Sequence, residues 1–138
     1  MTLRRQFDLL PADRQFLDDY GLPWETIVDG RPMWVLIHDF PTPEGYNHER
    51  VTAAIRMETG YPNVELNMVY FFPALARKDG RQIGATNATQ AIDGKTYQRW
   101  SRHRTGQNAW KVGRDNLGSH VILIEDWLAR EFERCPCP

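Results

Sequence analysis

The chain has 138 residues, of which 41% are hydrophobic and 25% are charged. This size and composition are typical of one globular domain whose core needs neither a disulfide nor a metal ion. Lysine and arginine number 17 and aspartate and glutamate 18, which gives a net charge of -1. Such a balance disfavours attraction to nucleic acid or to an anionic membrane. We therefore expect one domain over residues 1–138, with a core over about 10–132, and neither of those two partners.

The first third of the chain predicts a helix followed by two strands. A helix is expected over residues 11–20, because Pro11 suits a first helical turn and Gly21 is a good stop. Short apolar runs then predict strands over 24–28 and 33–40, separated by an Asp-Gly turn signal. Strands in immediate succession favour antiparallel pairing.

The rest of the chain predicts two more strands, a long loop and a helix. Apolar and polar residues alternate over 51–57 and 64–72, which completes a four-stranded antiparallel meander. Periodicity is lost over 74–112, and a loop this long is usually functional. A helix over 115–134 is expected to pack across one face of the sheet, since its apolar residues fall at helical spacing: Leu117, Val121, Ile124, Leu128 and Phe132. The fold class is therefore α+β.

Cysteine usage and the absence of long apolar runs predict a cytoplasmic protein. The only cysteines are Cys135 and Cys137, in a tail over 135–138 that we expect to be disordered, and a disulfide between residues two apart is unfavourable. No stretch has the length of a signal peptide or a transmembrane helix. The four histidines have no ligand spacing, so neither a metal site nor a cofactor is expected.

A series of short motifs runs along the chain in a distinctive order: Leu10-Pro11, Asp39-Phe40-Pro41, Pro43-Glu44-Gly45-Tyr46-Asn47, Gly60-Tyr61-Pro62 and Trp100-Ser101-Arg102-His103. Together with the order of elements, these motifs resemble the ubiquitin-conjugating-enzyme superfamily, and most closely family E of its prokaryotic members. The resemblance extends from about Leu10 to Trp127. It implies the ubiquitin-conjugating fold, with the long loop as the active-site loop.

The resemblance also implies an activity and a set of partners. Proteins of this kind are similar to acyltransferases that accept a ubiquitin-like protein from an adenylating (activating) enzyme and pass it to an amine of a protein target. The expected partners are therefore a ubiquitin-like protein, an adenylating enzyme and a target, in a bacterial pathway similar to ubiquitination.

The predicted loop contains no cysteine, which is the usual acyl carrier of the superfamily. Ser101 lies nine residues before Trp110, close to where the family's spacing would put that cysteine. A serine would carry the ubiquitin-like protein as an oxyester, and its hydroxyl needs a base. His103, two residues further on, is the candidate base, because an imidazole exchanges protons near neutral pH.

Other loop residues are candidates for binding or for the nucleophile. Arg102 can hold the ubiquitin-like tail or a developing oxyanion, and the amide of Asn87 is a candidate oxyanion donor, with Asn108 as a substitute. Several hydroxyl side chains compete with Ser101, and Thr89 is the best of them because Asn87 is close: Thr86, Thr89, Thr96, Thr105 and Tyr97.

Two other functions stay open. The first is a catalytically inactive variant that acts as a binding or adaptor module in the same pathway, which the missing cysteine favours. The second is an unrelated hydrolase or nucleic-acid-processing domain that uses His103 with Arg99, Arg102 and Arg104. The near-neutral net charge and the lack of interleaved stacking aromatics disfavour this last reading.

Overall fold

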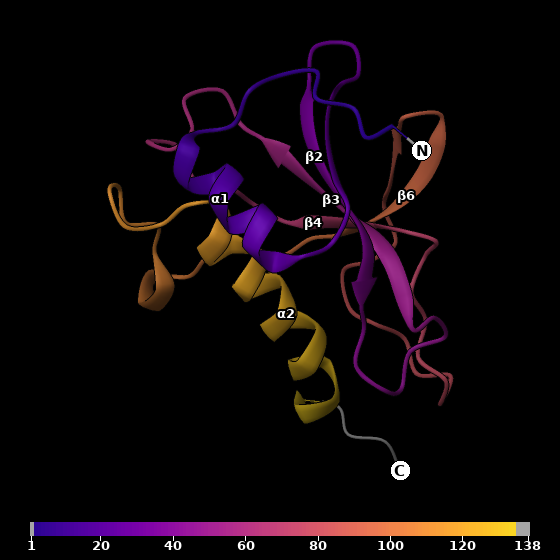
Figure 1. Cartoon of the computed structure of the whole chain (residues 1–138). Coiled ribbons are helices and arrows are strands. Elements are labelled where there is room, and N and C mark those ends of the chain that lie inside the picture. Colours follow the sequence, from indigo (N-terminus) through magenta and orange to yellow (C-terminus); the bar gives the residue numbers. More distant parts are fainter. Residues whose placement is uncertain (1, 135–138) are drawn as a thin grey trace.

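The computed structural model describes residues 2–134, so the predicted tail over 135–138 lies outside the described residues. The elements follow in the order α1 (Pro11–Tyr20), β1 (Trp24–Val28), β2 (Met33–Pro41), β3 (Arg50–Met57), β4 (Val69–Phe72), β5 (Thr89–Ile92), β6 (Lys95–Trp100), a 3-10 turn η1 (Gly106–Asn108) and α2 (Leu117–Arg134). Within this part of the chain, six strands form one antiparallel sheet in the order β1-β2-β3-β4-β6-β5. Both helices lie on one side of it (Figure 1). The α+β class is confirmed.

The elements that the sequence marks by capping residues and alternation are confirmed. Helix α1 has the predicted bounds, and Gly21 ends it in the left-handed conformation with φ +84. Strands β1, β2 and β3 begin and end within about one residue of the predicted bounds. The predicted fourth strand is shorter than expected, since only 69–72 pairs and Met68 leaves the extended conformation with φ +60.

The prediction of four strands and one uninterrupted loop over 74–112 was wrong. A hairpin of β5 and β6 lies within that stretch, and β6 pairs with β4 from Val69 opposite Trp100. Asp93 and Gly94 join the two strands with φ values of +54 and +75, the conformation that suits a two-residue hairpin turn. The irregular part of the chain therefore consists of two shorter segments, 73–88 and 101–116.

Each face of the sheet buries its own apolar cluster. On the inner face, four buried residues of α2 pack against the strands, as predicted: Leu117, Val121, Ile124 and Leu128. Trp100 is fully buried in the same cluster, with its ring edge-on to that of Phe71 at 5.3 Å. The outer face buries a smaller cluster that includes Trp34, Tyr70 and Tyr97. Burial of each large apolar side chain contributes about 1.5–3 kcal/mol.

The Gly60-Tyr61-Pro62 corner ties the two helices together. The hydroxyl of Tyr61 donates a hydrogen bond to a carboxylate oxygen of Asp13 at 2.6 Å and accepts one from the backbone N–H of Leu117 at 2.7 Å. Burial raises the pKa of the Asp13 carboxyl, opposed by its hydrogen bond from Tyr61. The corner thus fixes where α2 begins relative to α1, and α2 forms one wall of the site described below.

His120 of α2 makes the stability of the fold depend on pH. Its ring is fully buried, and its Nε2–H donates to the carbonyl of Met68 at 2.8 Å, which leaves Nδ1 unprotonated. Within residues 2–134, Nδ1 has no hydrogen-bond partner. Burial lowers the pKa of His120 from 6.5 to about 4, because protonation would place a charged ring in the core.

We expect the free energy of unfolding to fall as the pH drops from 6.5 toward 4. In this range the unfolded chain binds a proton at His120 that the folded chain excludes, so a loss of about 3 kcal/mol accumulates by pH 4 and is absent above pH 6.5. The free energies of unfolding measured with urea at about pH 7.5 and about pH 5 should differ by about 2 kcal/mol because of His120. His120→Gln should remove most of that difference, and an unchanged pH dependence in the variant would contradict the assignment.

Candidate functional site

The segment over 101–116 joins the last strand of the sheet to α2 and forms one side of a cavity of about 650 Å³. Arg102 and His103 line the cavity from this segment, while Asp126, Arg130 and Arg134 line it from α2. The segment is anchored at its far end, because the indole N–H of Trp110 donates to the carbonyl of Pro62 at 3.0 Å. Ser101, which the sequence predicts as the acyl carrier, directly precedes the two cavity residues Arg102 and His103 but does not itself line the cavity.

Ser101 directly follows β6 and is held by two hydrogen bonds. Its backbone N–H donates to the carbonyl of Ala85 at 3.0 Å, and its Oγ accepts from the guanidinium Nε of Arg99 at 3.1 Å. The residue is half-buried. A cation that donates to a hydroxyl oxygen leaves the hydroxyl proton free to be given to a base and stabilises the oxygen as it loses that proton.

His103 is exposed, and no hydrogen bond joins it to Ser101 in the part of the chain that the structure describes. The two residues lie on the same segment, but the structure does not bring them into contact. His103 instead faces the cavity between the segment and α2. Its ring has room to reorient, since it is not packed into the core.

Arg102 is fixed by its surroundings. Its guanidinium lies 4.8 Å from the centre of the Trp100 ring, and its Nη1 donates to the carbonyls of Gly84 at 3.0 Å and Ser101 at 3.2 Å. Burial lowers the pKa of Arg102 from its usual value. Arg102 therefore joins the segment to residues 84–85 and holds a positive charge beside Ser101.

Asn87 lies on a neighbouring segment but not at Ser101 itself. Residues 84–88 run beside residues 99–102, because Arg99 donates its backbone N–H to Ala88 at 2.9 Å. Asn87 is exposed and lines a separate hollow of about 270 Å³. No hydrogen bond links it to Ser101 within the described residues. The competing hydroxyl of Thr89 is exposed at the start of β5, opposite Gln98.

Arg99 donates a hydrogen bond to the Ser101 hydroxyl, a role that was not predicted from the sequence. The sequence suggested it only as part of a basic cluster, although a strand predicted over 95–100 would have put Arg99 and Ser101 on one face of the chain, two residues apart. Arg104, another member of that cluster, is drawn inward. Its guanidinium lies 4.9 Å from the centre of the Trp110 ring and pairs with Asp115 at 3.5 Å.

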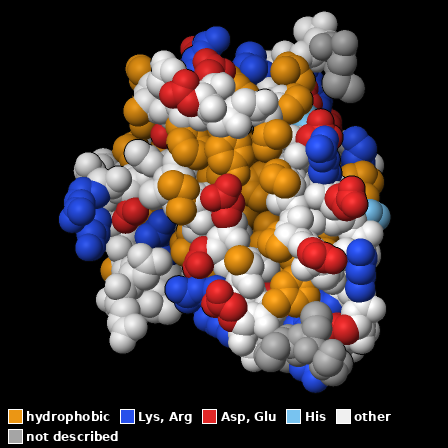
Figure 2. Space-filling view, turned by 60° about the horizontal axis from the view of Figure 1, so that its bottom comes forward, with side chains coloured by type: hydrophobic (Ala, Val, Ile, Leu, Met, Phe, Trp, Pro, Cys, Tyr) orange, Lys and Arg blue, Asp and Glu red, His pale blue; other side chains and the backbone are white. Residues whose placement is uncertain are grey.

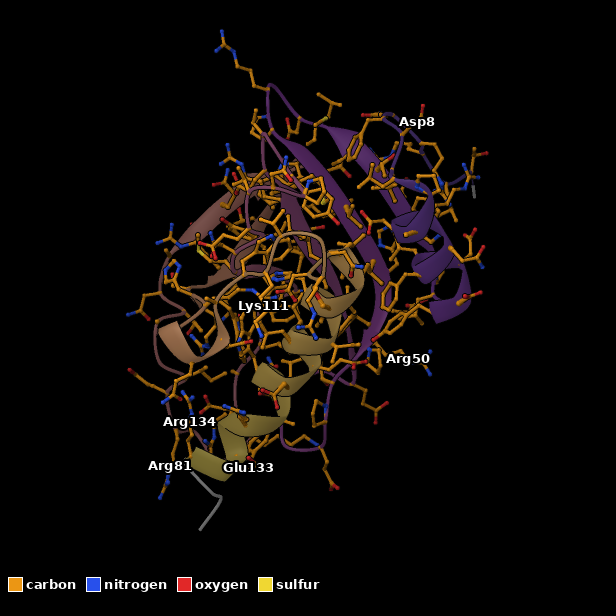
Figure 3. The ribbon with its side chains drawn as sticks, turned by 90° about the vertical axis from the view of Figure 1, so that its left-hand side faces the viewer. Asp8, Arg50, Arg81, Lys111, Glu133 and Arg134 are labelled. Carbon is orange, nitrogen blue, oxygen red and sulfur yellow. The ribbon has the colours of Figure 1, made fainter. Side chains whose placement is uncertain are left out.

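The charges around the cavity favour an acidic or carboxylate-bearing ligand. Arg130 pairs with Asp126 at 2.8 Å, and Glu131 pairs with Arg77 at 3.0 Å, so the two carboxylates that line the cavity are both neutralised. Arg134 stands at the end of α2 (Figure 3). With Arg102 it gives the cavity an excess of positive charge.

Two further features bear on the chemistry available. In residues 2–134, no group of three or more histidine, cysteine, aspartate or glutamate side chains is arranged to hold a metal ion. In the same part of the chain, no helix combines the length and the apolar character that crossing a membrane requires.

Two helices lie on one face of an antiparallel sheet, and a polar segment joins the last strand to the last helix. This arrangement is consistent with the ubiquitin-conjugating-like class. The chain belongs to the family described as prokaryotic E2 family E, whose model matches residues 9–131. No curated protein and no solved structure matches the sequence. Membership of this family supports a ubiquitin-conjugating-like role and argues against the hydrolase or nucleic-acid reading.

Proposed function

We propose that this protein accepts a ubiquitin-like protein from an adenylating enzyme as an oxyester on Ser101 and transfers it to an amine of a target protein. The observation that carries the proposal is the hydrogen bond from Arg99 to the Ser101 hydroxyl at 3.1 Å, in a family E chain without a cysteine in residues 1–134. The protein is thereby an acyltransferase that uses a hydroxyl where its relatives use a thiol.

The chemistry assigns a separate task to each group. The Ser101 Oγ attacks the activated carbonyl carbon at the C-terminus of the ubiquitin-like protein, and His103 turns toward Ser101 to take the hydroxyl proton. Arg99, which already donates to the Ser101 Oγ, stabilises the negative charge that develops on the carbonyl oxygen, and Arg102 and the Asn87 amide are the further candidate donors. The bond from the carbonyl carbon to the activating group of the adenylating enzyme then breaks, and His103 gives its proton to the departing group. An amine next attacks the oxyester as its proton passes to His103, the bond from the carbonyl carbon to the Ser101 Oγ breaks, and His103 returns the proton to that oxygen.

The cavity between the segment and α2 supports a path for the tail of the ubiquitin-like protein. The two residues that follow Ser101 in the sequence, Arg102 and His103, line it. Its unneutralised charges are positive, as described above, and they complement the backbone carbonyl oxygens of an extended tail. The Ser101 hydroxyl lies with Arg99 on the other side of β6 from this cavity, so the chain end must pass the edge of the segment to reach it.

The proposal is tested by incubating the protein with the adenylating enzyme, the ubiquitin-like protein and ATP, and measuring its intact mass. An adduct of the size of the ubiquitin-like protein is expected, and Ser101→Ala should abolish it. Thr96→Ala is the matched control, because Thr96 is an exposed hydroxyl of β6 outside the cavity and its loss should leave the adduct unchanged. If Ser101→Ala forms the same adduct at the wild-type rate, the assignment of Ser101 is wrong.

A second candidate function is an inactive adaptor in the same pathway. Two observations favour it: His103 does not contact Ser101 within residues 2–134, and the surface carries exposed apolar side chains, with Val112 61% and Ile122 59% exposed. Figure 2 shows a central band of hydrophobic side chains bordered by charged ones, a pattern typical of protein-binding surfaces. Binding of the ubiquitin-like protein without an adduct, while the adenylating enzyme is active, would select this function.

A further inference from the structure

The outer face of the sheet, opposite the helices, holds a second polar hollow of about 520 Å³. Three neighbouring strands contribute polar residues to it, among them Glu25 from β1, His38 from β2 and Thr52 from β3. Each lies two residues from a member of the buried outer cluster, Ile27, Leu36 and Ala54 respectively, so all three point to the same face.

A chain of hydrogen bonds joins these three side chains. A carboxylate oxygen of Glu25 lies 2.8 Å from Nε2 of His38, and Nδ1 of His38 lies 3.1 Å from the hydroxyl oxygen of Thr52. Within residues 2–134, the bond between Thr52 and His38 is the one hydrogen bond that joins a side-chain hydroxyl to a histidine ring. The same ring also contacts the Glu25 carboxylate. A hydroxyl, an imidazole and a carboxylate in sequence are the parts of an activated nucleophile.

The proton positions in this chain follow from Glu25. Arg4 donates to the Glu25 carboxylate from its backbone N–H at 2.9 Å and from its Nε at 2.7 Å, and these bonds lower the pKa of Glu25 to about 2. The carboxylate is therefore ionised and can only accept. Nε2 of a neutral His38 must carry the proton, which leaves Nδ1 as an acceptor for the hydroxyl proton of Thr52.

The local backbone aims His38 at its two partners. The pairing of β2 with β3 shifts between Ile37 and Phe40, and Asp39 within this bulge has φ +57. A bulge redirects the side chains around it, and bulges are frequent beside active sites. The left-handed conformation also costs an aspartate conformational energy. Such a conformation persists only where the surrounding structure requires it.

Two cationic side chains line the same hollow as the Thr52 hydroxyl. Thr52 is directly opposite Phe72 in the antiparallel pairing of β3 with β4, so the two side chains are neighbours. The ammonium group of Lys95 lies 5.8 Å from the centre of the Phe72 ring. Lys95 lines the hollow together with Arg50, whose exposed side chain lies at the surface (Figure 3). These two charges can stabilise an oxyanion formed at Thr52.

We propose that Thr52 is the nucleophile of a second reactive site, which acts on small carboxylic esters. The Thr52 Oγ forms a bond to the carbonyl carbon of the ester as its proton passes to Nδ1 of His38, and the bond from that carbon to the leaving oxygen then breaks as His38 protonates the departing alcohol. Water releases the acyl group by the reverse sequence of proton transfers. The hollow is of the size that small ligands occupy.

This site is separate from Ser101 and does not depend on the function proposed above. Thr52 is opposite Phe72 at one end of β4, whereas Ser101 follows Trp100, which is opposite Val69 at the other end. The reaction involves no ubiquitin-like protein and no adenylating enzyme, so it can be measured with the purified chain alone.

The test substrate is p-nitrophenyl acetate. Release of nitrophenolate measures the rate of hydrolysis, and peptide mass mapping identifies the residue that carries the acetyl group. An acetyl group is expected on Thr52. Thr52→Val should lower the rate by about 10²- to 10⁴-fold, the range that a positioned nucleophile and base provide, and His38→Gln should lower it similarly. Thr52→Ser should keep the activity, because it retains the hydroxyl. Thr89→Val should have no effect, since Thr89 is exposed and contacts no histidine in the described chain.

The proposal is overturned if Thr52→Val hydrolyses the ester at the wild-type rate, or if the acetyl group is found on Lys95 and not on Thr52. Urea unfolding of each variant separates loss of the hydroxyl from loss of the fold. A folded Thr52→Ser chain without activity would also contradict the role of the hydroxyl.

Discussion

Arg77→Met is expected to lower the free energy of unfolding by about 3–5 kcal/mol, the range measured when one member of a buried ion pair is removed. The Arg77 side chain is fully buried and bonds to two carboxylates: its Nε lies 3.0 Å from Asp79, and its Nη1 lies 3.0 Å from Glu131. Both carboxylate side chains are only 12% exposed, so without Arg77 they would keep their charge with little access to water.

The contact of Arg77 with Glu131 also joins the segment 73–88 to the last turns of α2, where the wall of the cavity lies. The guanidinium packs against Phe132 at 4.8 Å, and the Phe132 ring in turn fills the space where Gly45 would otherwise carry a Cβ. Substitution of Arg77 should therefore loosen the end of α2 as well as lower stability.

Arg130→Met is the matched control for Arg77→Met. Arg130 lies on α2, the helix of Glu131, and pairs with Asp126 at 2.8 Å, but its side chain is 53% exposed, so its removal should cost less than about 0.5 kcal/mol. Urea unfolding of the three proteins measures both effects. A loss below about 1 kcal/mol for Arg77→Met would show that the buried pair contributes no more than a surface pair.

His103→Gln is expected to slow formation of the adduct on Ser101 by about 10²- to 10⁴-fold, the usual contribution of a general base. Glutamine retains polarity and similar size but does not accept a proton near neutral pH. Because His103 is exposed, the substitution should change the free energy of unfolding by less than about 0.5 kcal/mol. The rate of adduct formation, followed by intact mass under saturating adenylating enzyme, measures the effect.

The control for His103→Gln is the same change at His48, a half-buried histidine in the loop between β2 and β3. His48→Gln should leave the rate unchanged. Equal rates for wild type and His103→Gln would exclude His103 as the base, and the oxyester chemistry would then need a proton acceptor supplied by a partner protein.

The sequence was informative where structure is determined by neighbouring residues. Helix α1 is framed by Pro11 and Gly21, and β3 by strict alternation, so both could be predicted closely. The hairpin of β5 and β6 was missed, because its buried residues, Ile92, Tyr97 and Trp100, do not alternate regularly and β5 is exposed over its first three positions. Its turn residues Asp93 and Gly94 were the local signal that could have revealed it.

The candidate sites were less predictable, because they depend on the pairing of distant strands. Spacing from Trp110 was enough to select Ser101, but the hairpin had to be known before Arg99 could be placed beside it. The hydrogen-bonded chain of Glu25, His38 and Thr52 joins residues 13 and 14 positions apart, and only the register of three strands brings them together. No local pattern contains that information.

The proposed oxyester between Ser101 and the ubiquitin-like protein is tested most directly by the chemical stability of that bond. In a chain with Cys135→Ser and Cys137→Ser, the adduct should survive thiol reductant and break in hydroxylamine. Adding Ser101→Cys should convert it to a thioester at the same position, which reductant then cleaves. An adduct that resists both reagents in both chains, as an amide on a lysine would, contradicts the account.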